Sequence, residues 1–126
     1  MTTRADTIAE KIAEAMTSRD VNKLDRLFHA DIVLWQAPTG QVVPRSAYLA
    51  MSAAVFNATS ELGYRNVRRH PIEGGFIQQH QLVGRRADGT PIPAVEICMI
   101  IKFRDDQLTS VEECFDLARL SAAFGR

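Results

Sequence analysis

Every second residue between positions 95 and 103 is apolar, and this alternation constrains the fold more than any other feature of the sequence. The apolar positions are Val95, Ile97, Met99, Ile101 and Phe103. The positions between them carry Glu96, Cys98, Ile100 and Lys102. Successive side chains of a strand point to opposite faces of its sheet. The segment therefore predicts an antiparallel strand that covers a core with one face only.

The Asp-Gly pair at residues 88–89 joins this strand to the preceding one. Such a pair between two strand-like runs is a strong hairpin signal, and a two-residue turn here pairs His80 with Ile97 and Gln78 with Met99. Directly opposed residues share a face, so the imidazole and the amide point to the core. Burial without partners costs such groups roughly 1–3 kcal/mol each. We therefore expect Gln78 and His80 to line a small-molecule pocket; the alternative is a structural amide that anchors a core histidine.

The final hairpin decides which acidic side chain joins this face. A three-residue loop at 104–106 pairs Ile97 with Glu113 and keeps Val111 and Phe115 on the core face. A two-residue turn would instead bring in Glu112, Cys114 and Asp116. The first register is preferred because it buries the apolar side chains of Val111 and Phe115. Under it, His80, Ile97 and Glu113 lie in a row across three adjacent strands, and we expect the imidazole and the carboxylate to perturb each other's pKa.

The remaining elements follow from apolar periodicity and from turn signals. A capping box at Thr7 and Glu10 predicts the start of the first helix. Helices are expected over residues 8–18, after Asp20 and from Pro44 to Gly63, and strands over 32–36, 64–72, 76–86, 92–103 and 107–115. The tail 116–126 has helix-like apolar spacing and could act as a lid. Helices followed by an antiparallel meander predict one α+β domain over residues 1–126.

Composition excludes several function classes. Lys+Arg and Asp+Glu both number 15, so the chain lacks the basic excess of a nucleic-acid-binding domain. No apolar run is long enough to span a bilayer, and the N-terminus lacks the apolar segment of a secretory signal, so a cytoplasmic protein that binds no membrane is expected. Neither CxxC nor HExxH occurs, and the two cysteines are too few for a disulfide framework.

Two stretches resemble a known family. Residues 28–35 read Phe-His-Ala-Asp-Ile-Val-Leu-Trp and lead into the first strand, and residues 113–116 read Glu-Cys-Phe-Asp and close the last. With three helices before a curled sheet, the chain resembles the nuclear-transport-factor-2-like superfamily, in particular SnoaL-like polyketide cyclases, ketosteroid isomerases and limonene-1,2-epoxide hydrolases. The resemblance implies a cone-shaped, strongly curled antiparallel sheet wrapped around the N-terminal helices, which is a cystatin-like α+β barrel. It also implies a deep apolar pocket, no cofactor and a homodimer through the outer sheet face.

The resemblance transfers the family's catalytic residues only in part. The isomerase positions correspond here to Ile12, Ala37 and Met99, none of which can exchange a proton, so the usual ketosteroid isomerase chemistry is not expected. The hydrolase triad corresponds to Gln78, His80 and Glu113, in which two charged groups are changed.

We therefore expect a cofactor-free isomerase, cyclase or hydrolase that acts on a small apolar epoxide or carbonyl compound. In this reading His80 is the general acid or base, Glu113 is its charge partner and Gln78 orients it. The substrate-binding walls are expected from Trp35, Gln36, Met51, Val55, Phe56, Phe76, Ile97, Met99 and Phe115. The alternatives are a non-catalytic binding module for a lipophilic ligand and an association domain with a filled core.

Overall fold

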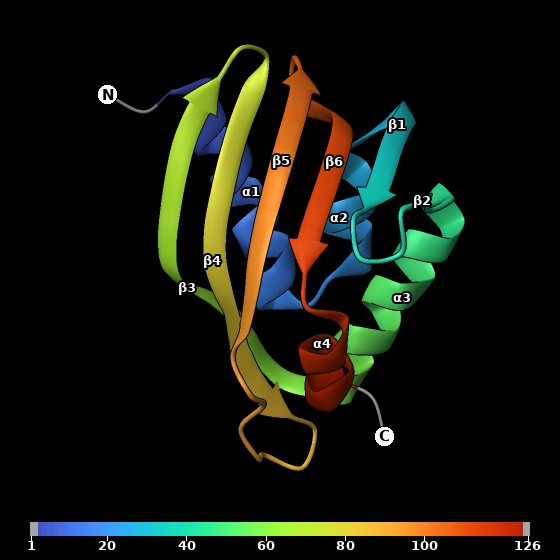
Figure 1. The fold of residues 1–126 in the computed structure, drawn as a ribbon, viewed down its shortest axis with the longest axis vertical. Coiled ribbons are helices and arrows are strands. Elements are labelled where there is room, and N and C mark those ends of the chain that lie inside the picture. Colours follow the sequence, from blue (N-terminus) through green and yellow to red (C-terminus); the bar gives the residue numbers. More distant parts are fainter. Residues whose placement is uncertain (1–2, 125–126) are drawn as a thin grey trace.

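Four helices and six strands make up the computed structural model, which describes residues 3–124 (Figure 1). In chain order they are α1 (Arg4–Ser18), α2 (Val21–Leu27), β1 (Phe28–Gln36), β2 (Gln41–Val42), α3 (Arg45–Ala58), β3 (Thr59–Ile72), β4 (Gly75–Arg86), β5 (Val95–Arg104), β6 (Gln107–Phe115) and α4 (Leu117–Phe124). The strands form one sheet in the order β2-β1-β6-β5-β4-β3. The sheet is curled but not closed. Helices α1 and α2 lie against one face, and α3 lies along the β1 side. The α+β fold class is confirmed.

One pair of strands departs from the expected meander. Strand β1 runs parallel to β6, whereas all other neighbouring strands are antiparallel, so the sheet is mixed. The parallel pairing places Gln36 opposite Glu113 and Trp35 opposite Glu112. Because neighbouring positions face opposite ways, Gln36 joins the core face and Trp35 joins the outer face.

Two helix boundaries differ from the sequence-based expectation. Helix α1 begins one turn early, because Thr3 and Asp6 form the capping box: the Thr3 hydroxyl accepts from the Asp6 backbone N–H, and the Asp6 carboxylate accepts from that of Thr3. Helix α3 ends at Ala58 instead of Gly63. The Thr59 hydroxyl donates to the Val55 carbonyl at 2.9 Å, and its extended backbone starts β3.

The hairpin between β4 and β5 has the predicted register. His80 lies opposite Ile97, and Gln78 lies opposite Met99. The turn itself sits one residue earlier than expected, because the Gly89 N–H donates to the Arg86 carbonyl at 2.8 Å. A bridge between Arg85 and Pro91 shows the displaced pairing near the turn, and the segment before β5 absorbs the extra residue. Both polar side chains therefore face the core, as expected.

The hairpin between β5 and β6 has a different register from the expected one. Arg104 pairs with Gln107 across a two-residue turn, and a bulge follows between Lys102 and Phe103. The bulge restores the predicted face, so Val111, Glu113 and Phe115 share one side of β6. It also shifts the partners: Ile97 faces Phe115, and Glu113 faces Met99. Glu113 therefore lies in the row of Gln78, not in the row of His80.

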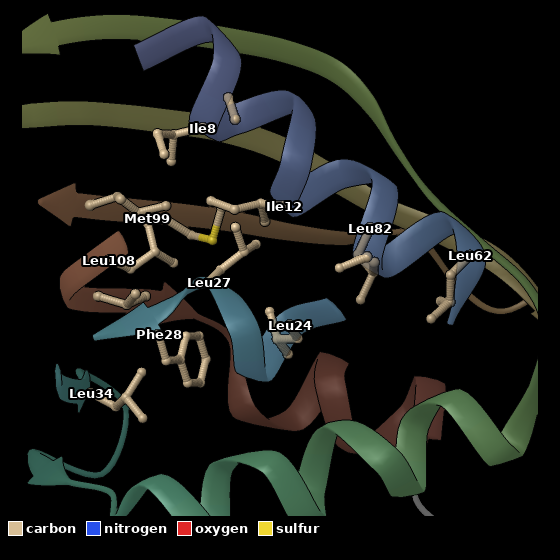
Figure 2. Close-up of a cluster of buried hydrophobic side chains, with 14 of the residues drawn as sticks. Ile8, Ile12, Leu24, Leu27, Phe28, Leu34, Leu62, Leu82, Met99 and Leu108 are labelled. Carbon is tan, nitrogen blue, oxygen red and sulfur yellow. The ribbon is translucent and has the colours of Figure 1, made fainter. Parts of the chain in front are cut away.

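The core lies between the helices and the concave face of the sheet (Figure 2). Ile8 and Ile12 from α1 and Leu24 and Leu27 from α2 are buried. Their strand neighbours in the same cluster include Phe28, Leu34, Leu82, Met99 and Leu108. None of the helices in the described residues is long and apolar enough to cross a membrane.

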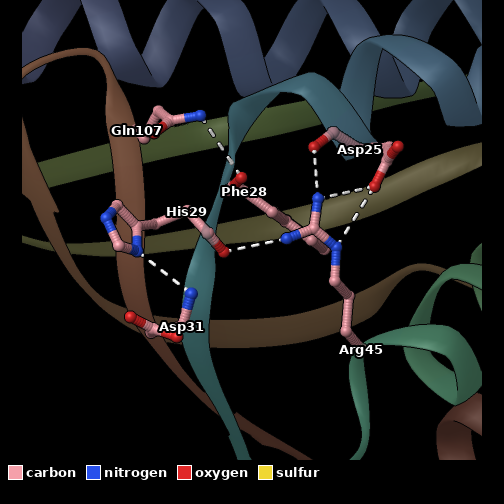
Figure 3. A network of polar contacts seen from close by, with 6 residues as sticks. All are labelled: Asp25, Phe28, His29, Asp31, Arg45 and Gln107. Carbon is pink, nitrogen blue, oxygen red and sulfur yellow. Dashed lines mark hydrogen bonds and ion pairs between the residues drawn. The ribbon is translucent and has the colours of Figure 1, made fainter.

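A polar cluster around Arg45 joins α2, β1 and α3 (Figure 3). The Arg45 guanidinium donates to the Asp25 carboxylate at 2.7 and 3.2 Å and to the His29 carbonyl at 2.8 Å. It also lies 5.6 Å from the centre of the Phe28 ring, against which Tyr48 packs edge-on. This cluster holds the start of α3 in place and so positions Tyr48 over the sheet.

Candidate functional site

A cavity of about 130 Å³ lies between the helices and the concave face of the sheet. Its walls are apolar for the most part and include side chains from α1, α2, α3, all strands except β2, and α4. The polar side chains at the cavity are Gln36, Tyr48, Ser52, Tyr64, His80 and Glu113. For scale, an apolar protein cavity of about 150 Å³ accepts benzene. The core is therefore not filled, contrary to what a pure association domain would show.

His80 forms the polar part of the β4 wall. Its side chain has no exposure to solvent, and its Nδ1 lies 3.0 Å from the Gln78 Nε2. The other ring nitrogen, Nε2, is the only buried side-chain nitrogen or oxygen in the described part of the chain without a hydrogen-bond partner. Burial lowers the pKa of His80 to about 4, and the Glu96 charge opposes this only in part. The imidazole is therefore neutral at neutral pH.

The Tyr64 ring fixes the orientation of this imidazole. The two ring centres are 3.8 Å apart, and the planes meet at 24°, which is a stacked arrangement. Tyr64 comes from β3 opposite Leu82 of β4, so it lies on the same face of the sheet as His80. Burial and the nearby Glu113 charge raise the pKa of the Tyr64 hydroxyl far above its usual range. The phenol thus stays protonated and can donate a hydrogen bond.

Glu113 supplies a carboxylate on the β6 side of the same cavity. Burial raises the pKa of Glu113, while interactions with the Tyr48 hydroxyl and the Gln36 side chain lower it in part. The pKa of Tyr48 is raised as well: burial and the Glu113 charge bring it well above the ordinary value. A buried carboxyl group of raised pKa beside a phenol is a candidate for proton transfer.

The expected register that put Glu113 in the row of His80 is wrong, and neither group is among the causes of the other's pKa shift. The pKa of His80 depends on burial and Glu96, whereas that of Glu113 depends on burial, Tyr48 and Gln36. The two-residue turn and the bulge explain the error, because they move Glu113 from the row of His80 to the neighbouring row. His80 and Glu113 therefore lie on the same face of the sheet, in neighbouring rows on the two strands that flank β5.

Most of the residues predicted to form the site line the cavity. They are Gln36, Met51, Val55, Phe56, His80, Ile97, Met99, Glu113 and Phe115. Trp35 does not, because it faces outward beside Glu112. Phe76 is fully buried but lines a separate groove near the start of α1. Gln78 lies behind His80 and touches the cavity only through it.

Sequence reasoning missed both tyrosines of the chain as site residues. The signal that could have found them is the amphipathic nature of the phenol, which needs a partner for its hydroxyl when the ring is buried. The chain contains two tyrosines in all, and both line this cavity.

The described residues contain no group of three His, Cys, Asp or Glu side chains that could hold a metal ion. What the cavity does offer is a neutral imidazole from β4, and a carboxyl group from β6 with a phenol from α3 beside it. This arrangement can hold a small, largely apolar molecule through hydrogen bonds to one or two of its polar atoms. The carboxyl group can also accept a proton from such a molecule or donate one to it.

Comparisons with known proteins agree with this architecture. A family model described as a SnoaL-like domain matches residues 9–111. A search of curated proteins found no significant match. Solved structures resemble the chain at the level of the fold.

Three of the similar structures illustrate this likeness. A putative isomerase from Bacillus subtilis has a TM-score of 0.78 at 17% identity, covering 97% of this chain and 93% of that chain. A putative SnoaL-like polyketide cyclase from Shewanella putrefaciens has a TM-score of 0.78 at 11% identity, covering 98% and 97%. A hypothetical protein from Catenulispora acidiphila, with a ketosteroid isomerase-like fold and bound trimethylamine, has a TM-score of 0.74 at 20% identity, covering 94% and 92%. The predicted resemblance is thereby confirmed for the fold.

Proposed function

The chain belongs to the SnoaL-like domain family, and we propose that it binds a small, largely apolar carbonyl compound and catalyses a proton transfer on it without a cofactor. The reaction class is that of an isomerase or cyclase, in which a proton leaves the carbon next to a carbonyl group. The observation that carries the proposal is the buried, unpartnered His80 Nε2 at a cavity that also contains Glu113.

The unpartnered nitrogen supports ligand binding for an energetic reason. A buried polar group without a hydrogen bond costs about 1–3 kcal/mol, and native structures contain few such groups. A ligand atom that bonds to Nε2 would recover this free energy. The surrounding apolar walls would in turn remove the rest of the ligand from water.

Glu113 is the better candidate for the base. A base works best when its pKa is near the working pH, and burial moves the pKa of Glu113 upward, toward that range. The pKa of His80, near 4, moves away from it. His80 and the two phenols are then placed to stabilise the oxygen on which charge develops. Epoxide hydrolysis is less well supported, because no arginine or lysine lines the cavity within the described residues.

Deuterium exchange tests this proposal directly. The protein is incubated with cyclopentanone in D₂O, and NMR follows the loss of the hydrogens next to the carbonyl. We expect exchange above the buffer rate in the wild type and its loss in Glu113→Gln. Glu112→Gln is the matched control, because Glu112 is the exposed neighbour on the opposite face, and it should keep the wild-type rate. Equal rates in all three proteins would overturn the catalytic assignment.

A non-catalytic binding module for a lipophilic ligand is the second candidate. The observation that favours it is the apolar character of Ile12, Ala37 and Met99, where the resemblance places isomerase catalytic groups. Saturable binding of cyclopentanone to the cavity, seen as shifts of cavity resonances without any deuterium exchange, would support this reading. Absence of both binding and exchange would count against the two candidates alike.

We also propose that the chain forms a homodimer through the outer face of the sheet. Ile77, Ile100, Glu112 and Trp35 form a row across β4, β5, β6 and β1 on that face. Three of these four side chains are apolar or aromatic and partly exposed. Analytical ultracentrifugation should show a dimer for the wild type and a monomer for Ile100→Lys. A monomeric wild type would refute the proposal.

A further inference from the structure

We propose that a chain of hydrogen bonds from Asp6 through Arg69 and Gln78 fixes the tautomer of His80, so that the proton is on Nε2 and the cavity holds its ligand by an acceptor oxygen. Each link joins side chains of known donor and acceptor character. The proposal rests on the proposed function for the position of the ligand. It adds that His80 donates the hydrogen bond and the ligand accepts it, and it assigns Asp6, Arg69 and Gln78 as positioning residues.

The first step is the orientation of the Gln78 amide. Arg69 Nε lies 3.1 Å from the Gln78 Oε1. A guanidinium group has donors only, so the amide oxygen has to face Arg69. The opposite end of the amide, the NH₂ group, then faces His80 Nδ1 at 3.0 Å. Residue pairing supports this arrangement, because Arg69 and Gln78 are directly opposed on β3 and β4.

The second step is the tautomer of His80. An amide NH₂ group can only donate, so Nδ1 has to accept and carries no proton. Burial keeps the imidazole neutral, and a neutral imidazole carries its one proton on the other nitrogen. The proton is therefore on Nε2, and this nitrogen is the one without a partner.

The third step is the anchoring of Arg69. Its Nη1 donates to the Asp6 carboxylate at 2.9 Å, and the pair is only partly exposed. Its guanidinium also lies 5.9 Å from the centre of the Phe76 ring. Asp6 is itself held by the capping box with Thr3, and these bonds keep its pKa low. The orientation of the imidazole is thus linked to the first turn of α1.

The consequence concerns the ligand. A ring N–H on one wall binds a carbonyl or ether oxygen and disfavours an ammonium group at that point. The stacked Tyr64 covers one face of the imidazole and so leaves the ring plane as the direction for a hydrogen bond. With the donor on His80, the base has to be another group at the cavity, and Glu113, which interacts with Tyr48, is the carboxyl group there. His80 therefore donates, and Glu113 accepts the proton.

The test is the tautomer itself, read by long-range ¹H–¹⁵N NMR of the histidine ring. We expect a protonated Nε2 and an unprotonated Nδ1 in the wild type at pH 7. Gln78→Glu places an acceptor beside Nδ1 and should move the proton to Nδ1 or charge the ring. Arg69→Met should release the amide and give a mixture of tautomers, whereas Arg68→Met, the exposed neighbour, should not.

Each outcome decides a separate point. Protonated Nδ1 in the wild type would overturn the proposal without reference to any variant. A wild-type tautomer that persists in both Arg69→Met and Gln78→Glu would overturn the relay. Titration with cyclopentanone is the second readout: it should shift the His80 Nε2–H signal and bind about tenfold more weakly to Gln78→Glu. The expected tautomer without any cyclopentanone binding would support the relay and overturn the proposed function alone.

Discussion

Acidification from pH 7 to pH 4 should destabilise the protein through His80. The imidazole has a pKa of about 4 in the folded chain and about 6.5 in the unfolded chain. The unfolded state therefore binds a proton at a higher pH than the folded state does. Stability due to the neutral, buried ring is fully present above pH 6.5 and is lost progressively as the pH falls toward 4.

The magnitude follows from the two pKa values. One pKa unit corresponds to about 1.4 kcal/mol. Over this interval the linkage relation gives a loss of about 3 kcal/mol at pH 4, since the folded ring is half protonated there. Domains of this size unfold with a free energy of about 5–15 kcal/mol, so the loss is a large fraction of the total.

Urea denaturation of the wild type and of His80→Gln at pH 7 and pH 4 measures this effect. Other titrating groups, including Glu113, are present in both proteins and contribute equally to a first approximation. The free energy of unfolding should fall by about 3 kcal/mol more in the wild type than in the variant. An NMR titration of the His80 ring gives the pKa directly if the variant does not fold. A pKa near 6.5, or equal losses in the two proteins, would refute the reasoning.

Three further substitutions test the fold and the cavity. Glu113→Gln should raise the free energy of unfolding at pH 7: burial raises the pKa of this carboxyl group, so its stabilising neutral form is lost as the pH rises above about 4.5. The difference from the wild type should shrink toward pH 4 in urea titrations. Gly75→Ala should cost roughly 2–4 kcal/mol, because a Cβ there would lie 1.8 Å from the Ile101 carbonyl oxygen. Gly63→Ala, where nothing lies within 4 Å, is the control in the same thermal melts. Arg45→Lys should cost about 1–2 kcal/mol, because an ammonium group cannot reproduce the forked bonds of the guanidinium; an unchanged melting temperature would contradict this.

Local patterns were sufficient for part of the candidate site. The alternation of residues 95–103 and the Asp-Gly turn placed Gln78 and His80 on the core face, and the observed pairing agrees. The prediction is correct although the turn lies one residue early, because the segment before β5 contains the extra residue and restores the predicted pairing. Amphipathic periodicity likewise located α1, α2 and most of α3, since it depends only on residues close in sequence.

Features that depend on contacts between distant segments could not be predicted in this way. The bulge at Lys102 and Phe103 left Glu113 on the predicted face but changed its partner. Bulges insert one residue without a distinctive sequence signal. The parallel pairing of β1 with β6 brings Gln36 beside Glu113, which lies 77 residues further along the chain, and turns Trp35 outward.

The two ionisable side chains His80 and Glu113 change the stability of the fold in opposite directions as the pH changes. His80 destabilises the fold when it is charged at low pH, and Glu113 destabilises it when it is charged at higher pH. No lysine or arginine of the described residues lines the cavity to stabilise the carboxylate. Within the cavity, the Tyr48 hydroxyl and the Gln36 side chain are the groups that offset the cost of burying this carboxylate. If Glu113→Gln stabilises the protein and also abolishes deuterium exchange, the carboxylate is retained for chemistry at the expense of stability. A stabilised variant with normal exchange would instead assign the cavity to binding alone.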